Sequence, residues 1–152
     1  MGRLAEIVAS FLGAGYSKFA PGTVGALFAT ALLYFTRGLV DAYWFYIPLL
    51  VLLTYVGGIW AIKNLPDSWE HDDGRIVVDE AHGIFITMLF VPFSLKHVAI
   101  GFVLFRLFDI IKPLGIKKFD QLKSDHGVML DDTLAGIYSN VVLQILIIWV
   151  IQ

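Results

Sequence analysis

Long apolar runs occupy most of this chain, and acidic residues stand at the ends of three of them. The three acidic segments are residues 78–83, 105–113 and 127–136. Ionisable groups at the ends of membrane helices are costly unless they pair, bind an ion or take part in chemistry. The segments hold five carboxylates and two cations, namely Asp79, Glu80, Asp109, Asp131, Asp132, Arg106 and Lys112. That composition is typical of a metal-assisted site that faces a phosphate.

The overall composition favours a membrane protein with a single domain. Of the 152 residues, 58% are hydrophobic and 16% are charged, against roughly 45–50% and about 25% in ordinary globular domains. A net charge of −2 argues against a nucleic-acid partner. The lack of cysteine excludes thiolate zinc sites and thiolate nucleophiles. The first residues lack the basic segment of a cleavable signal peptide, so we expect internal helices to insert the chain.

Apolar periodicity predicts an all-α fold. Residues 3–12 place apolar side chains on one helical face, which predicts an amphipathic helix in the membrane interface. A stripe packed on the protein's own core is the alternative. A glycine-rich loop at 13–23 precedes an apolar helix that continues to about residue 36. A further helix at 43–62 is long enough to cross a bilayer, and we expect the last helix at 132–151.

Residues 80–111 are predicted to form a helical hairpin. A proline and polar residues interrupt the apolar stretch at 92–96, so we expect one arm at 80–91 and a return arm at 97–111. The prediction is a polytopic membrane protein with about five transmembrane or membrane-embedded helices. Nine of the eleven Lys and Arg residues then share one side, and by the positive-inside rule that side, with the acids, is cytoplasmic.

Asp109 is the most diagnostic of the acids. It is predicted near the C-terminal end of its helix, where the helix dipole disfavours an anion. Arg106 and Lys112 lie three residues away on either side, on the same helical face. The alternative to a functional site is a local ion-pair ladder, although a ladder alone hardly explains an acid at this position.

Two acid pairs, at 79–80 and 131–132, are predicted to open helices. Acids at helix N-termini often act only as caps, and this alternative applies to both pairs. Gly83 and Gly136 each lie four residues after a candidate acid. Small residues there would let the helices approach closely and bring the acidic segments together. Oxygen ligands without cysteine select Mg²⁺ or Mn²⁺ over zinc.

The loop before residue 24 is a candidate phosphate-binding element. Lys18 and the turn at 21–23, which ends in Thr23, precede a helix N-terminus whose free N–H groups attract phosphate. Most such turns bind nothing, so the pattern is weak by itself. His82 and His126 lie beside the acids, where phosphate contact or proton transfer is one interpretation and an ordinary polar role is the alternative.

Four segments follow one another in a recognisable order: residues 20–25 (Ala-Pro-Gly-Thr-Val-Gly), 76–80 (Ile-Val-Val-Asp-Glu) with Gly83, 105–113, and 127–132 with Ala135 and Gly136. Together they resemble the motifs of the phosphatidylglycerophosphatase A family. The resemblance extends from about residue 13 to residue 140. The chain departs from the family pattern at residues 73–75, where a Pro-Ser-like pair is usual, and at His82 and His126.

The resemblance implies a bacterial inner-membrane enzyme with its active site on the cytoplasmic side. The reaction would be Mg²⁺-dependent hydrolysis of the terminal phosphomonoester of phosphatidylglycerophosphate, which gives phosphatidylglycerol and phosphate. The partner would be the phospholipid substrate in the bilayer. By the matching positions, the acidic site residues are Asp79, Glu80, Asp109, Asp131 and Asp132.

We expect Mg²⁺ to be held by Glu80, Asp109 and Asp132, with Asp79 and Asp131 as further ligands or as the base. The remaining assignments are Arg106 and Lys112 in catalysis, and Lys18 and Thr23 in phosphate binding. One alternative is a small ion or proton transporter that uses the same carboxylates, but its acids should lie near mid-membrane. Another is a phosphatase for a different lipid phosphate. The sequence makes no prediction of the oligomeric state.

Overall fold

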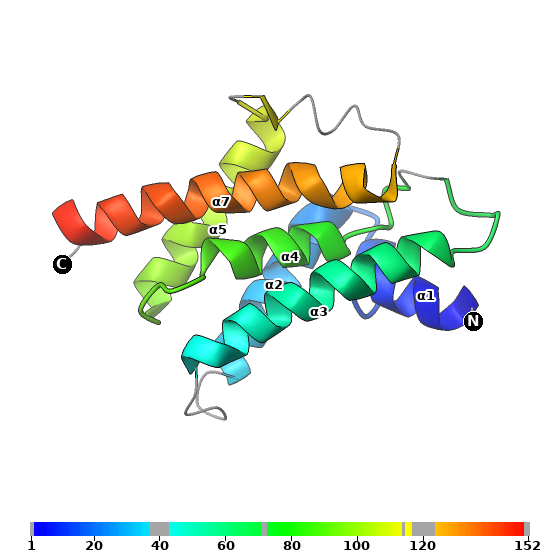
Figure 1. The fold of residues 1–152 in the computed structure, drawn as a ribbon, viewed down its shortest axis with the longest axis horizontal. Helices are drawn as coiled ribbons and strands as arrows, with labels where there is room; N and C mark the ends of the chain where they lie inside the picture. Colours follow the sequence, from blue (N-terminus) through cyan, green and yellow to red (C-terminus); the bar gives the residue numbers. More distant parts are fainter. Residues whose placement is uncertain (1, 37–42, 71–72, 114, 117–123, 151–152) are drawn as a thin grey trace.

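The computed structural model describes residues 2–36, 43–70, 73–113, 115–116 and 124–150. Within these residues the chain is all-α, as predicted, with six α-helices and no strand (Figure 1). The elements are α1 (Gly2–Ala9), η1 (Ala14–Tyr16, a 3₁₀ turn), α2 (Pro21–Thr36), α3 (Tyr43–Lys63), α4 (Val78–Thr87), α5 (Leu95–Ile111) and α7 (Asp125–Trp149).

Helix α4 lies at the centre of the bundle and contacts α2, α3, α5 and α7. Every residue from 81 to 87 is buried, as expected for a helix that other helices surround. With 10 residues it is about 15 Å long, and it runs beside only part of α7 (Figure 1). Its acidic first turn therefore stands at one end of the core.

The predicted hairpin is formed by α4 and α5. Helix α4 ends at Thr87, four residues before the expected position, and the connecting turn includes Phe90 with a left-handed φ of 56°. Ser94 caps α5, because its side-chain oxygen accepts a hydrogen bond from the His97 backbone N–H at 3.0 Å. The return arm thus begins two residues earlier than predicted, at Leu95.

The end of α4 is closed by a side chain of α7. The last carbonyls of a helix have no partner within it. Asn140 Nδ2 donates to the carbonyl oxygens of Thr87 and Leu89 at 2.9 and 2.8 Å. Gln144 Nε2 in turn donates to Asn140 Oδ1 at 2.8 Å. These bonds satisfy backbone groups that would otherwise face apolar surroundings.

Two segments are long and apolar enough to cross a membrane, by length and composition: Trp44–Lys63 within α3, and α7. Helix α2 is apolar but has only 16 residues. The fold therefore supports membrane helices without confirming the five predicted spans. Four cations that entered the topology count lie outside the described residues, namely Arg37, Lys117, Lys118 and Lys123.

The predicted start of the last helix at residue 132 was wrong. Helix α7 begins at Asp125, and Ser124 caps it by accepting a hydrogen bond from the Gly127 N–H at 3.1 Å. A polar first turn that contains a glycine concealed this start. Asp131 and Asp132 therefore lie in the second turn, where they are buried, and the capping alternative does not apply to them.

Helix α1 is shorter than predicted and divides its apolar residues between two faces. It ends at Ala9, and both Phe11 and Leu12 have left-handed φ values, of 44° and 60°. Phe11 is buried, with its ring 5.9 Å from that of Phe28. The apolar residues that remain exposed are Leu4, Ile7 and Leu12. Part of the apolar stripe at 3–12 thus packs on the protein's own core, which was the alternative. The location of its exposed residues in the membrane interface stays a prediction.

The polar loop between α3 and α4 is fastened by Arg75. Its guanidinium donates to the Asp73 carboxylate at 2.8 and 2.5 Å and lies 4.0 Å from the centroid of the Trp69 ring. These hydrogen bonds lower the pKa of Asp73 from 3.8 to about 2. The Arg75 carbonyl lies so close to Gly15 that a Cβ there would overlap it. The loop therefore also holds the segment that precedes α2.

Because folding lowers the pKa of Asp73, its ionised form stabilises the fold above about pH 4, and this contribution is lost as the pH falls toward about 2. We expect Asp73→Asn to lower Tm near neutral pH, with a difference from wild type that shrinks as the pH falls through this range. Thermal unfolding in detergent, followed by circular dichroism, measures it. The exposed Asp67→Asn should have little effect, and a pH-independent effect of Asp73→Asn would contradict the prediction.

Helices α4 and α7 cross at a pair of glycines. A Cβ on Gly136 would lie 2.7 Å from the carbonyl oxygen of Gly83. A Cβ on Gly83 would overlap the Phe105 ring and lie 3.0 Å from the carbonyl oxygen of Asp132. Only glycine permits two backbones to approach so closely. The role predicted for these two glycines is confirmed.

Gly136→Ala should force the two helices apart and destabilise the protein by about 1–3 kcal/mol. The matched control is Gly57→Ala in α3, where a Cβ would meet only Val8 Cγ1 at an ordinary 3.7 Å. Alanine there should stabilise the helix by roughly 0.5–1 kcal/mol. Unfolding in detergent measures both variants. Equal effects of the two substitutions would contradict the assigned crossing.

Candidate active site

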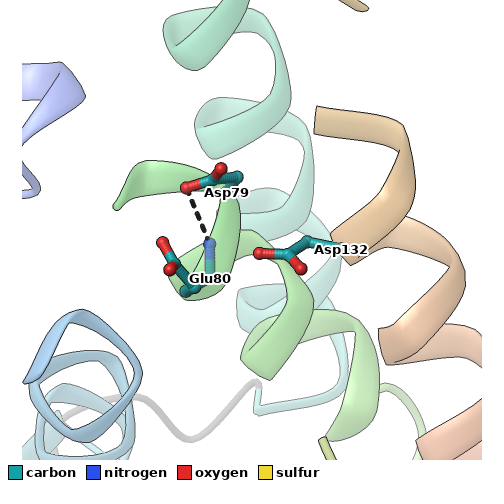
Figure 2. Close-up of side chains that lie close together, drawn as sticks. All are labelled: Asp79, Glu80 and Asp132. Carbon is teal, nitrogen blue, oxygen red and sulfur yellow. Dashed lines mark hydrogen bonds between the residues drawn. The ribbon is translucent and has the colours of Figure 1, made fainter. Parts of the chain in front are cut away.

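Three acids from two helices meet where α4 begins. Asp79, Glu80 and Asp132 each offer a carboxylate oxygen, and these oxygens all lie within 4.8 Å of one another. Figure 2 shows Asp132 pointing from α7 toward the first turn of α4, which carries the other two. Asp79 Oδ1 also accepts a hydrogen bond from the Glu80 N–H at 3.1 Å, which satisfies one free donor of the first turn although Asp79 is not the N-cap of α4. Three oxygens so placed can share one cation.

Arg106 of α5 joins this acidic group. Its Nη1 atom lies 2.5 Å from Asp109 Oδ2 and 4.0 Å from Glu80 Oε1. Arg106 Nε and Glu80 Oε2 are buried without a hydrogen-bond partner among the described residues. A buried polar group left without a partner is costly, and a charged one more so. The unpartnered donor of Arg106 and the unpartnered acceptor of Glu80 fit a site that binds an anion next to a cation.

Lys112 connects the end of α5 to α7. Its Nζ atom donates to Asp131 Oδ2 at 2.7 Å, and its backbone has a left-handed φ of 48° at the C-cap of α5. Of the ion-pair ladder considered around Asp109, the pair between Asp109 and Arg106 is therefore present. Lys112 instead forms a salt bridge across two helices, which holds Asp131 beside the shared acids.

All five predicted acids belong to one electrostatic group. Asp131 interacts with Asp79 and Asp132, and Asp109 interacts with Glu80 and Asp132. With five carboxylates against the two cations Arg106 and Lys112, the fully ionised group carries a formal surplus of three negative charges (five minus two). Such a surplus in a largely buried place calls for a bound cation or for protons. Oxygen donors without cysteine fit Mg²⁺.

The metal ligands stay a prediction, and the structure places only two of the three predicted residues in the three-acid group. Glu80 and Asp132 share the three-acid group, but its third member is Asp79. Asp109, which was predicted as the third ligand, pairs with Arg106 and lies beside Asp132. The reason is its place near the C-terminal end of α5, within reach of the arginine one turn earlier.

The N-terminus of α2 faces the same group. A Cβ on Gly22 would overlap Glu80 Oε1 and lie 3.4 Å from Arg106 Nη1. The first N–H groups of a helix have no partner within it and attract anions. Thr23 follows in this first turn and is half-buried, whereas Lys18 is exposed in the preceding loop. The phosphate-binding roles predicted for Thr23 and Lys18 stay predictions.

Gly22 is the site residue that sequence reasoning missed. It lay inside the turn that was singled out, but the role was assigned to its neighbour Thr23. Glycine is unfavourable within a helix, and here it directly follows Pro21, the first residue of α2. The close neighbour that requires glycine here is the Glu80 carboxylate, because it occupies the space that a Cβ on residue 22 would need.

His82 and His126, the two histidines beside the acids, each form a hydrogen bond with a side chain of α3. His82 is buried, and its Nδ1 lies 3.0 Å from Thr54 Oγ1. Because the Thr54 hydroxyl donates to the Leu50 carbonyl at 2.7 Å, we assign the proton of this contact to the histidine. His126 Nδ1 lies 3.2 Å from the hydroxyl of Tyr55. These contacts support the ordinary polar role that was the alternative for both histidines.

Comparison with known proteins assigns this chain to a family. The family model described as phosphatidylglycerophosphatase A matches residues 7–147. The chain belongs to the phosphatidylglycerophosphatase A family. The resemblance noted in the four sequence segments is thereby confirmed, over a longer part of the chain than those segments cover.

Individual relatives of this family cover nearly the whole chain. A Haemophilus influenzae protein named phosphatidylglycerophosphatase A is 36% identical over 148 residues, which are 96% of this chain and 90% of that protein. An Escherichia coli K12 protein of the same name is 36% identical over 137 residues, 88% of this chain and 78% of that protein. A Bacteroides thetaiotaomicron protein, 42% identical over 148 residues (93% and 92%), carries the provisional name phosphatidylinositol-3-phosphatase. No solved structure gave a significant match.

Membership of the phosphatidylglycerophosphatase A family makes this chain an enzyme of the lipid phosphatase class. The two long apolar helices and the membrane-lipid substrates in the relatives' names together indicate a membrane protein. The acids, Arg106 and the α2 N-terminus thus form the candidate active site of a membrane-bound phosphatase.

Gly22→Ala should lower the phosphatase activity by about 10²-fold, because its methyl group would displace Glu80 from the acidic group. The control is Gly74→Ala, where a Cβ would have no neighbour within 4 Å. Phosphate release and helical circular dichroism of both variants measure activity and folding. A folded Gly22→Ala protein with wild-type activity would show that this contact does not position Glu80.

Proposed function

We propose that this protein removes the terminal phosphate of phosphatidylglycerophosphate in a Mg²⁺-dependent reaction, and that it does so at the cytoplasmic face of a bacterial inner membrane. The observation that carries the proposal is the group of Asp79, Glu80 and Asp132 next to Arg106 and the open end of α2. This arrangement offers acidic ligands to a cation and positive groups to a phosphate. The names of the relatives support the choice of lipid.

Glu80, Asp132 and Asp79 would hold the metal, with Asp109 beside them. When bound, Mg²⁺ offsets phosphate charge and makes water a better nucleophile. Arg106 and the first N–H groups of α2 bind the phosphoryl oxygens and stabilise the charge on the transferring group. Lys112 holds Asp131 in place through their 2.7 Å salt bridge. Lys18 and Thr23 lie in the segment through which the headgroup would enter.

The proposed reaction is direct attack of water on phosphorus. The bond from phosphorus to the glycerol oxygen breaks, and the products are the lipid alcohol and inorganic phosphate. Asp131, or Asp79 where it does not hold the metal, accepts the proton that the attacking water loses. The leaving glycerol oxygen takes up a proton from that carboxyl group or from solvent to become the hydroxyl of phosphatidylglycerol. An aspartyl-phosphate intermediate would be the alternative route, and we rank it second.

A second candidate substrate is a phosphoinositide monophosphate. The provisional name of the 42% identical Bacteroides relative points to this headgroup. Both lipids present a phosphomonoester on a headgroup beyond the lipid's own phosphodiester, so the same acids and Arg106 could serve either. The transporter alternative is disfavoured, because the acids cluster at one end of the core and the family is named for a phosphatase.

The first experiment measures phosphate release by the purified protein from phosphatidylglycerophosphate in mixed micelles, with Mg²⁺ and with EDTA. The panel includes phosphatidylinositol-3-phosphate, phosphatidic acid and a soluble phosphomonoester. We expect release that requires Mg²⁺ and is fastest for phosphatidylglycerophosphate. Preference for the phosphoinositide would select the second candidate. Release that EDTA leaves unchanged would refute the metal-dependent mechanism.

Asp109→Asn should reduce phosphate release by roughly 10²–10³-fold while the protein stays folded and membrane-bound, because it removes the carboxylate that holds Arg106. Asp67→Asn, in the exposed loop after α3, is the matched control. Initial rates and detergent-extracted yield are compared for the two variants. Full activity of Asp109→Asn would remove Asp109 from the site.

A further inference from the structure

A shallow groove lies between α2 and α5, outside the acidic centre. Its cavity volume is about 290 Å³, and it is lined by Leu27, Ala31, Tyr34 and Phe35 of α2 and by Leu95 and Val98 of α5. The remaining lining residue, Thr30, donates its hydroxyl to the Ala26 carbonyl of its own helix at 2.8 Å. The exposed lining is almost wholly apolar. Such a surface suits a hydrocarbon and not a charged headgroup.

On α5 the groove lies on the same helical face as the site. Leu95, Val98, Phe102 and Arg106 follow one another at steps of three or four residues. Residues at these steps lie along one side of a helix. The face that borders the groove at the start of α5 therefore carries the site arginine near its other end.

Helix α2 also connects the site with the groove, but here the site lies at the start of the helix and the groove toward its end. Leu27 lies four residues after Thr23, which belongs to the first turn beside the acids. That first turn is close to Arg106, since a Cβ on Gly22 would lie 3.4 Å from its Nη1. At the far end Phe35 shares the groove with Leu95. The two helices are thus antiparallel neighbours, and the helix faces that line the groove also carry, farther along, the α2 first turn and Arg106 of the site.

We propose that this groove holds an acyl chain of the phospholipid substrate while Arg106 and the α2 N-terminus hold its terminal phosphate. The inference rests on the proposed function. Arg106 lies eight positions after Val98, about 12 Å farther along the helix. This distance leaves room for a headgroup unit between the phosphate and the acyl chain.

The groove can be filled without touching the site. Leu27→Trp and Ala31→Trp place a large ring in it, and Leu52→Trp, at a 58% exposed position of α3, is the matched control. The two substrates are dioleoyl phosphatidylglycerophosphate in micelles and its deacylated, water-soluble headgroup. For the lipid, kcat/KM of the groove variants should fall about tenfold. For the deacylated headgroup it should equal that of wild type, and the control should match wild type on both.

Two kinetic results would overturn the inference. Groove variants that hydrolyse the lipid as fast as Leu52→Trp would mean that bulk lipid alone fills the groove. An equal loss on both substrates would mean that the ring disturbs the site and not acyl-chain binding. A wild-type protein that releases phosphate from no lipid would instead refute the proposed function.

Photolabelling tests the groove independently of turnover. Phosphatidylglycerophosphate with a diazirine on one acyl chain is added to the wild-type protein without Mg²⁺, irradiated, and the labelled peptides are identified by mass spectrometry. We expect label in α2 and α5 at the groove, and less of it with phosphatidylglycerol bearing the same diazirine. Label spread evenly over the exposed apolar faces of α3 and α7 would refute acyl-chain binding in the groove.

Discussion

The acidic centre depends on the close approach of two helix backbones, α4 and α7, at Gly83 and Gly136. Because neither residue has a side chain, the acids about one turn earlier on each helix come within reach of one another. Repulsion between these carboxylates opposes the approach. Packing around α4, which four other helices surround, holds them together, and a bound cation would remove the remaining repulsion. The geometry of the site is thus set by the glycine crossing and by the packing around α4, which lie outside the acidic group itself.

The site has an anionic half and a cationic half that meet at Glu80. On one side are Asp79 and Asp132; on the other are Arg106, 4.0 Å from Glu80 Oε1, and the first turn of α2 packed against the same carboxylate. The two halves suit a phosphate beside a cation, because the acids would hold the cation and the positive groups would bind the phosphate oxygens. One glutamate therefore aligns the two halves.

Much of the fold could be predicted because strong local signals coincide. Pro92 and its polar neighbours marked the hairpin, and charges within an apolar sequence marked the acids. Features that depend on partners far away in the sequence could not be predicted. Helix periodicity relates only residues three or four apart, so it could suggest a pairing of Lys112 with Asp109 but not the salt bridge that Lys112 makes to Asp131 on α7. The start of α7 was missed for a local reason, because its capped first turn is polar.

The hydrogen bonds from Asn140 to the end of α4 also bear on how the chain is assembled. Helices of a membrane protein enter the bilayer in the order of synthesis, so the α4–α5 hairpin is made before α7 exists. Until then the carbonyls of Thr87 and Leu89 lack the donor that α7 supplies, and open carbonyls are costly in hydrocarbon. The hairpin is therefore a provisional structure that the last helix completes. Assembly and the candidate active site thus depend on the same helix, since α7 supplies both Asn140 and Asp132.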